Sequence, residues 1–206
     1  MSPRLPLREL EEASANPAGY RAKLFGPPRR PQGSIYFNSL RNAIFNFHKP
    51  RWTAAQAERY LEQRLDSAAN ASRKAEILDQ FHWYLEQYKD LGWPKALTRL
   101  NLNICLPSWA PADLVLSGQI ARVDFVPSGG YAGWIFVSGN AYGWREELRM
   151  PLLQEALAQK MSVTTDEIIV GLYAFESRSV EHTSYSAAEV MRACSSLERV
   201  LQRLHV

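Results

Sequence analysis

The side chains that most often carry catalysis are spread thinly along this chain. No two histidines have the H-E-x-x-H spacing that sets two imidazoles on one helix face for zinc, and no G-x-S-x-G nucleophile elbow is present. Ser128-Gly129-Gly130 and Ser138-Gly139 are too short for a phosphate-binding loop and are typical of turns. Cys105 and Cys194 lack a C-x-x-C spacing, so we expect free buried thiols. These patterns predict no metal site and no cofactor.

Basic residues crowd the first quarter of the sequence, and this pattern suits a polyanionic partner. A stripe of guanidinium and ammonium groups could follow a phosphate backbone, although solvated surface charge explains it equally well. Trp109 lies between two prolines in an expected loop, where it is a candidate to stack on a base. The candidate contacts to nucleic acid are Arg29, Arg30, Arg41, Lys49, Arg51, Trp109 and Arg122.

Composition limits the class of protein. The chain has 206 residues, of which 46% are hydrophobic and 22% charged, and its net charge is +3. These values predict one globular domain, and the mild positive charge permits DNA as a partner without requiring it. No run approaches the roughly 18 apolar residues of a membrane helix, and the start lacks the apolar segment of a secretion signal. We therefore expect a cytoplasmic protein with no membrane partner.

Hydrophobic periodicity predicts helices over the first part of the chain, residues 1–92. The run from Leu5 to Leu24 is typical of one or two short helices, with Pro17 as a break. A second apolar run extends from Ile35 to Phe47, and Thr53 is the expected cap of a helix that continues to Leu65. Lys74 to Leu91 has the clearest amphipathic spacing, and Gly92 is expected to end it.

The pattern changes after Pro94, so residues 93–206 are expected to contain the sheet. Leu100 to Leu106 alternates between apolar and polar residues, as a half-buried strand does. The other expected strands are 113–126, 131–137 and 168–175, with a turn at Ser128-Gly129-Gly130. Helical spacing returns over 144–161 and 186–206, where Met191 is counted on the apolar face. The predicted order is helices followed by βββαβα.

This order and several local motifs resemble the RecB/AddB-type branch of the PD-(D/E)XK nuclease superfamily, whose core is αβββαβ. Gly118-Gln119-Ile120-Ala121-Arg122-Val123-Asp124 is similar to the family's Gly-Arg-Ile-Asp-Arg-Val-Asp strand. Trp134-Ile135-Phe136-Val137-Ser138-Gly139 stands where the family has Val-Ile-Asp-Tyr-Lys-Thr-Gly. The resemblance implies a restriction-endonuclease-like α/β fold of the α+β kind, with a helical N-terminal part.

Flanking motifs extend the resemblance over nearly the whole chain. Leu148-Arg149-Met150-Pro151-Leu152-Leu153 resembles the helix that usually carries Leu-Gln-x-Pro-x-Tyr, with both polar positions changed. Asn16-Pro17-Ala18-Gly19-Tyr20 is similar to the family's Cys-Pro-x-x-Tyr motif. Arg41 stands where the family places a histidine. The resemblance therefore implies a degenerate nuclease site formed by Arg41, Ala121, Phe136, Ser138, Arg149 and Leu153.

These substitutions remove the groups that the family's chemistry needs. Hydrolysis of a phosphodiester assisted by Mg²⁺ requires hard oxygen ligands, and Ala121 and Phe136 offer none. Ser138 cannot supply the positive charge of the family's lysine. Relocated ligands remain an alternative, for which the nearby acids are Asp113, Asp124, Glu146, Glu147 and Glu176. Asp124 is three residues from Ala121, so we expect it on the other face of the strand.

Three functional hypotheses follow. The first is a catalytically inactive nuclease fold that binds single-stranded or branched DNA, or serves as a scaffold subunit beside a helicase or nuclease in a bacterial DNA-processing or phage-defence complex. The second is an active metal-dependent DNA nuclease with relocated ligands. The third is a protein-interaction adaptor with no nucleic-acid role.

Overall fold

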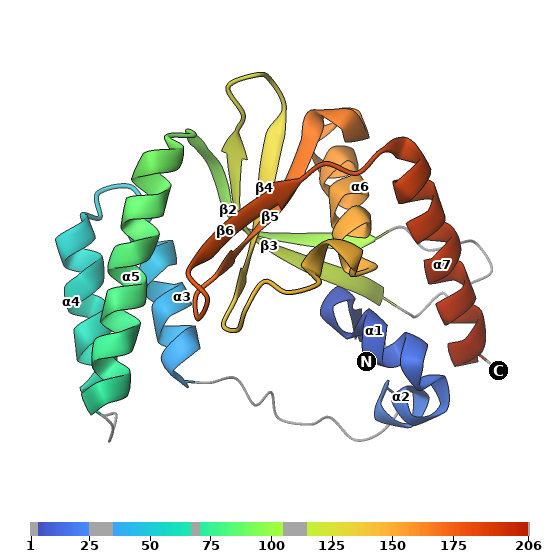
Figure 1. Cartoon of the computed structure of the whole chain (residues 1–206), viewed down its shortest axis with the longest axis horizontal. Helices are drawn as coiled ribbons and strands as arrows, with labels where there is room; N and C mark the ends of the chain where they lie inside the picture. The colour runs from blue at the N-terminus through green and yellow to red at the C-terminus, as the bar shows by residue number, and fades with distance from the viewer. Residues whose placement is uncertain (1–3, 25–34, 67–70, 105–114, 206) are drawn as a thin grey trace.

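A mixed β-sheet forms the centre of the fold in the computed structural model, which describes residues 4–24, 35–66, 71–104 and 115–205. Among these residues the sheet has six strands: β1 (Arg4–Pro6), β2 (Lys95–Ile104), β3 (Val115–Phe125), β4 (Tyr131–Val137), β5 (Ile168–Ala174) and β6 (Ser179–Thr183). Helices cover both sides (Figure 1). On one side lie α3 (Ile35–Phe47), α4 (Ala54–Leu65) and α5 (Ala71–Leu91), and on the other α1 (Leu10–Ala15), α2 (Pro17–Leu24), α6 (Arg149–Met161) and α7 (Ala187–His205).

The strands connect in the order expected from the resemblance. β2, β3 and β4 form an antiparallel meander, and β5 pairs in parallel with β4 after α6. β6 extends the sheet antiparallel to β5. The αβββαβ order is therefore present, with β6 and β1 as additions to it.

β1 corrects the expectation of a helix from Leu5. Residues Arg4–Pro6 pair in parallel with Val115–Ser117 of β3, and the first helical turn begins only at Leu7. Leu5 is fully buried in the core, so tertiary pairing outweighs local helical spacing here. Pro6 has no backbone N–H to donate, which suits the end of a short strand. Pro17 separates α1 from α2, as expected.

The two ends of β3 have different neighbours on the same side. Its start pairs with β1 at residues 115–117, and its end pairs with β4 at residues 122–125. No described strand pairs with residues 118–121 on that side. β1 and β4 therefore diverge along β3, and the space between them defines the candidate site.

Alternation along the central strands builds two hydrophobic clusters. On β4 and β5, Ile135 and Leu172 face the α6 and α7 side, whereas Trp134 and Tyr173 face the α3 and α5 side. A sheet covered on both faces requires apolar side chains in both directions, as found here. The second cluster is rich in aromatic rings from α3, α5, β4 and β5.

Helix ends mostly follow the sequence signals. Thr53 caps α4 through a reciprocal pair of hydrogen bonds with Gln56, and Gly92 follows α5 with a φ of 65°. α6 begins at Arg149, not at Trp144, which lies in a separate 3₁₀ turn, and Pro151 falls within the first turn of α6. Met191 is 68% exposed, so its expected place on the apolar face of α7 is wrong.

None of the described helices has the length and apolar character needed to cross a membrane. The expectation of a single domain over residues 1–206 stays a prediction.

Candidate functional site

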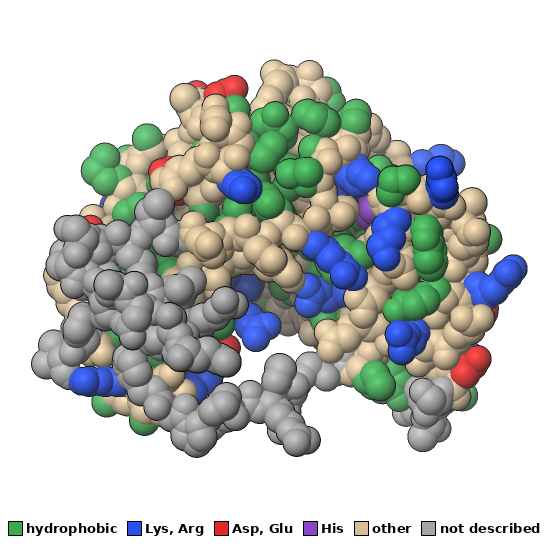
Figure 2. Space-filling model, turned by 180° about the vertical axis from the view of Figure 1, so that it is seen from behind, with side chains coloured by type: hydrophobic (Ala, Val, Ile, Leu, Met, Phe, Trp, Pro, Cys, Tyr) green, Lys and Arg blue, Asp and Glu red, His purple; other side chains and the backbone are tan. Residues whose placement is uncertain are grey.

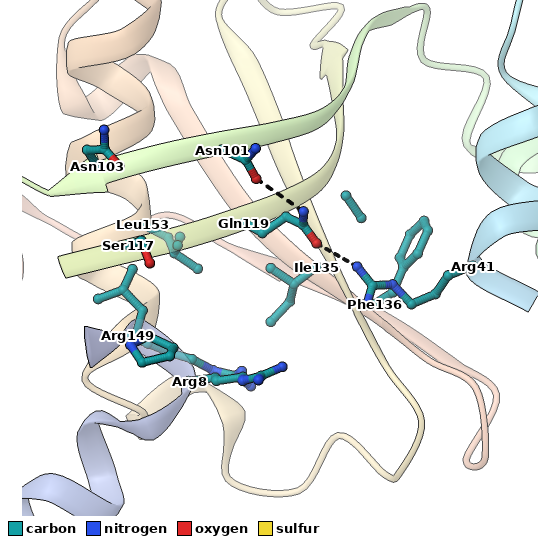
Figure 3. A pocket seen from close by; sticks show the side chains of 14 residues that line it. Arg8, Arg41, Asn101, Asn103, Ser117, Gln119, Ile135, Phe136, Arg149 and Leu153 are labelled. Carbon is teal, nitrogen blue, oxygen red and sulfur yellow. Dashed lines mark hydrogen bonds between the residues drawn. The ribbon is translucent and has the colours of Figure 1, made fainter. Parts of the chain in front are cut away.

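A pocket of about 520 Å³ opens where β1 and β4 diverge along β3. Its lining comes from the turn after β1, from α3, from β2, β3 and β4, and from the start of α6 (Figure 3). These segments are far apart in the sequence, and the sheet and its flanking helices bring them together. The volume lies within the range of about 300–1,000 Å³ that is usual for small-molecule sites.

The pocket gathers most of the residues expected at the degenerate nuclease site. Arg41, Ala121, Phe136, Arg149 and Leu153 all line it. Ser138 does not, because β4 ends at Val137 and Ser138 is exposed beyond that end. Because Ser138 lies outside the strand, the alternation of side chains along β4 does not direct it toward the pocket.

Neutral polar side chains form one surface of the pocket. Asn101 lies opposite Gln119, and Asn103 lies opposite Ser117, in the antiparallel pairing of β2 with β3. Gln119 Nε2 donates to Asn101 Oδ1 at 3.1 Å, and Arg41 donates through Nη2 to Gln119 Oε1 at 2.6 Å. These amides were not predicted as site residues, although the polar positions of the alternating strand Leu100–Leu106 were a signal for two of them.

Three arginines point into the pocket from two sides. In Figure 3, Arg8 and Arg149 extend from the side of the first turn and α6, and Arg41 reaches toward them from α3. Arg149 forms an ion pair with Glu147, whereas the side chain of Arg8 is 69% exposed and lies 3.8 Å from its acidic neighbour Glu9. In Figure 2, lysine and arginine side chains gather beside a hollow on the face seen from behind.

Arg41 has the least compensated charge of the three. Its Nε is buried and has no hydrogen-bond partner among the described residues, and its one hydrogen bond from Nη2 goes to the neutral Gln119. Burial lowers the pKa of Arg41, and the positive charges of Arg99 and Arg8 lower it further. Such a guanidinium favours an anion beside it, because an anion would satisfy the donor and relieve the repulsion.

Aromatic rings hold these cations in place on the α3 side. The guanidinium of Arg99 lies 4.2 Å from the ring centre of Phe45, and that of Arg41 lies 5.8 Å from it. Phe45 in turn stacks on Phe136, with ring centres 6.0 Å apart. Arg99 Nη2 donates to Asn42 Oδ1 at 2.8 Å, so its partner is also neutral.

The described lining does not fit the divalent metal that the family resemblance implies. No carboxylate lines the pocket among the described residues, and no group of three or more histidine, cysteine or acidic side chains in those parts of the chain is placed to hold a metal ion. Three guanidinium groups instead face the position where hard oxygen ligands would be required. The residues present are suited to an anion.

The acids considered as relocated ligands lie elsewhere or are not described. Asp124 is completely buried, accepts from Trp134 Nε1 within the aromatic cluster and does not line the pocket. Ile120 and Val123, also three residues apart on β3, pack into one cluster, so strict alternation does not hold here and the expected opposite faces of Ala121 and Asp124 stay a prediction. Glu176 follows the end of β5, where its N–H donates to Ser138 O, and it does not line the pocket. Glu147 is paired with Arg149, and Glu146 lies in the 3₁₀ turn before α6. Asp113 is outside the described residues.

Arg122 differs from its expected role as a nucleic-acid contact. It is completely buried and pairs with Asp124 through Nη2 at 2.7 Å. Its Nη1 donates to Tyr84 Oη at 2.5 Å and its Nη2 to Tyr173 Oη at 2.9 Å. The sequence showed an arginine on a strand but not the α5 helix that covers it. Arg122 thus links the sheet to the helical layer and does not reach the surface.

The remaining nucleic-acid candidates are not brought to the pocket. Lys49 and Arg51 are exposed after α3, and neither lines it. Lys49 instead donates to Asn46 Oδ1 at 2.7 Å. Arg29, Arg30 and Trp109 lie outside the described residues. Arg41 is therefore the one candidate of this set that the described structure places in the pocket. Arg8, which no sequence motif marked, is a further cation of the lining.

Comparison with known proteins supports the fold alone. No family model matches the chain, and no curated protein matches it in sequence. Among solved structures, the chain is similar to a "putative exonuclease" from Eubacterium rectale, with a TM-score of 0.54 and 8% sequence identity over 98% of this chain and 81% of that one. At this identity the likeness shows a mixed α/β, restriction-endonuclease-like fold, with a nuclease-like structural neighbour.

Proposed function

We propose that this protein is a RecB-type PD-(D/E)XK nuclease fold that no longer catalyses cleavage and binds nucleic acid through the pocket between β1 and β4. One observation carries the proposal: the described lining has three arginines and no carboxylate, at the position where the resemblance expects metal ligands. Arginine is suited to phosphate because its planar fork donates two parallel hydrogen bonds.

The neutral side chains of the pocket support the same function. Asn101, Asn103 and Gln119 offer amide donors and acceptors without adding charge that would repel a phosphate. The Nε of Arg41 is left without a partner, so a bound phosphate would compensate a donor that is otherwise buried and unsatisfied. We further propose that the protein acts as a DNA-contacting or scaffold subunit beside a helicase or nuclease in a DNA-processing or phage-defence complex.

Binding to single-stranded and branched DNA over a series of salt concentrations tests the nucleic-acid role. We expect the affinity to fall steeply with salt, because phosphate contacts release counterions. Arg41→Gln and Arg8→Gln should each weaken binding and reduce the slope of log affinity against log salt by about one. Arg59→Gln is the matched control, because Arg59 is exposed on α4 and does not line the pocket. No binding at low salt would overturn the proposal.

Incubation of plasmid DNA with Mg²⁺ or Mn²⁺ tests the loss of catalysis. We expect the DNA to stay intact. Cleavage that disappears in Asp113→Asn or Glu176→Gln would instead establish an active nuclease with relocated ligands. A protein complex that forms without DNA, survives high salt and tolerates Arg41→Gln would favour the adaptor role.

A further inference from the structure

The positive charges of Arg41 and Arg99 are not balanced by carboxylates among the described residues that bond to them. Arg41 and Arg99 have neutral hydrogen-bond partners, Gln119 and Asn42, and each guanidinium also lies against the ring of Phe45. Arg8 is close enough to act on Arg41 electrostatically, and its own contact with Glu9 is long at 3.8 Å. Arg41 thus lines the pocket from α3 with Arg99 on the same phenyl ring, and Arg8 lines it from the opposite side. Among the described residues, Glu9 at 3.8 Å from Arg8 is the one carboxylate with which these three cations form an ion pair.

This surplus exceeds the charge of one backbone phosphate. A phosphodiester carries one negative charge, whereas a terminal phosphate monoester carries about −1.5 to −2 at neutral pH and offers three acceptor oxygens. Hydrogen-bond donors face the pocket from two directions (Figure 3). The guanidinium of Arg41, whose Nε has no partner among the described residues, lies on one side, and the guanidinium of Arg8 lies on the other. A doubly charged group with three outward oxygens matches such an arrangement better than a diester, two of whose oxygens are bonded to carbon.

We propose that the pocket is a subsite for a terminal phosphate monoester, and that its physiological ligand is the phosphorylated end of a nucleic-acid strand. The inference rests on the proposed function and deepens it by naming the part of the strand that is recognised. Arg41 and Arg8 bind the phosphate oxygens, and the amides of Asn101 and Gln119 lie beside the adjoining nucleotide. A cavity of about 520 Å³ accommodates a strand end as it would a small ligand.

Fluorescence anisotropy with three single-stranded oligonucleotides of one sequence tests this subsite. One strand carries a 5′-phosphate, one a 3′-phosphate, and one has hydroxyls at both ends, with the dye attached away from the end under test. We expect one phosphorylated strand to bind about tenfold more tightly than the hydroxyl strand, the effect of one additional set of charge-assisted hydrogen bonds. Arg8→Gln should reduce this ratio toward one, whereas Arg59→Gln should preserve it.

Arg8 is the first variant to test because its side chain is 69% exposed, so its replacement leaves the core intact. Arg41→Gln is the second, and its circular dichroism spectrum should match that of the unaltered protein. Equal affinity for all three strands would overturn the subsite and leave the proposed DNA binding standing.

A free nucleotide shares the same monoester chemistry, so a separate arm uses deoxyadenosine monophosphate with deoxyadenosine as its control. In one outcome, the monophosphate raises the melting temperature, deoxyadenosine does not, Arg8→Gln removes the effect, and no strand binds. That outcome would keep the monoester site and overturn the nucleic-acid function. No response to strands or to the monophosphate would overturn both.

Discussion

Replacement of Asp124 by Asn should destabilise the protein strongly, because it leaves the charge of Arg122 buried without its carboxylate. Both side chains are completely buried, and Arg122 contacts Asp124 through Nε at 2.9 Å and through Nη2 at 2.7 Å. Breaking a buried ion pair by removing one partner costs about 3–5 kcal/mol. We expect about 3 kcal/mol, the lower end of that range, because the phenol oxygens of Tyr84 and Tyr173 still accept from Arg122.

The asymmetry of the pair supports this direction. Burial alone would lower the pKa of Arg122, but the oxygens of Tyr84, Tyr173 and Asp124 outweigh it and raise that pKa. Burial raises the pKa of Asp124 against the pull of Arg122, and Asp124 Oδ1 has no hydrogen-bond partner among the described residues. Without the carboxylate, Arg122 would remain buried with only neutral phenol oxygens as acceptors, so its positive charge would be uncompensated.

Urea denaturation followed by circular dichroism measures the loss. A decrease of 3 kcal/mol should lower Tm by about 6–12 °C in a chain of this length. Asp79→Asn is the control, because Asp79 pairs with Arg178 at the surface and such pairs contribute about 0–1 kcal/mol. The double variant Arg122→Met with Asp124→Leu should lose less than Asp124→Asn, since it leaves no unpaired charge. Equal losses in Asp124→Asn and Asp79→Asn would refute this reasoning.

Two further predictions concern acid sensitivity and a turn. Burial, together with the charges of Arg122 and Lys95, lowers the pKa of His48 to about 3. Below about pH 6.5 the unfolded chain therefore binds a proton at His48 that the folded protein does not, so the stability decreases as the pH is lowered. His48 should account for a loss of about 2 kcal/mol between pH 6.5 and 5, seen as a shallower pH dependence in urea titrations of His48→Gln. Gly130→Ala should cost more than Gly129→Ala in thermal melts, because both glycines have a positive φ but only at Gly130 would a Cβ meet a backbone oxygen, that of Glu167 at 2.0 Å. Equal melting temperatures for these two variants would contradict the clash.

Local signals were sufficient for elements whose stability depends on nearby residues. The cap at Thr53, the end of α5 at Gly92 and the amphipathic spacing of α5 all describe interactions within a few residues, and the structure contains each of them. The resemblance to nuclease motifs likewise predicted that Ala121 and Phe136 share one site, and both residues line the pocket. The order of the strands and the spacing of the motifs together determine which residues meet.

The sequence by itself determined that Ala121, Phe136 and Ser138 stand at the positions that resemble nuclease motifs, and that arginines lie near them along the chain. Only the tertiary structure decided which arginines matter: Arg122, on a strand in the expected motif, is buried beneath α5, whereas Arg8 reaches the pocket because β1 pairs with β3 more than a hundred residues away. The burial of a side chain depends on which distant element covers it. That information resides in long-range pairing and packing, which no local pattern of residues specifies.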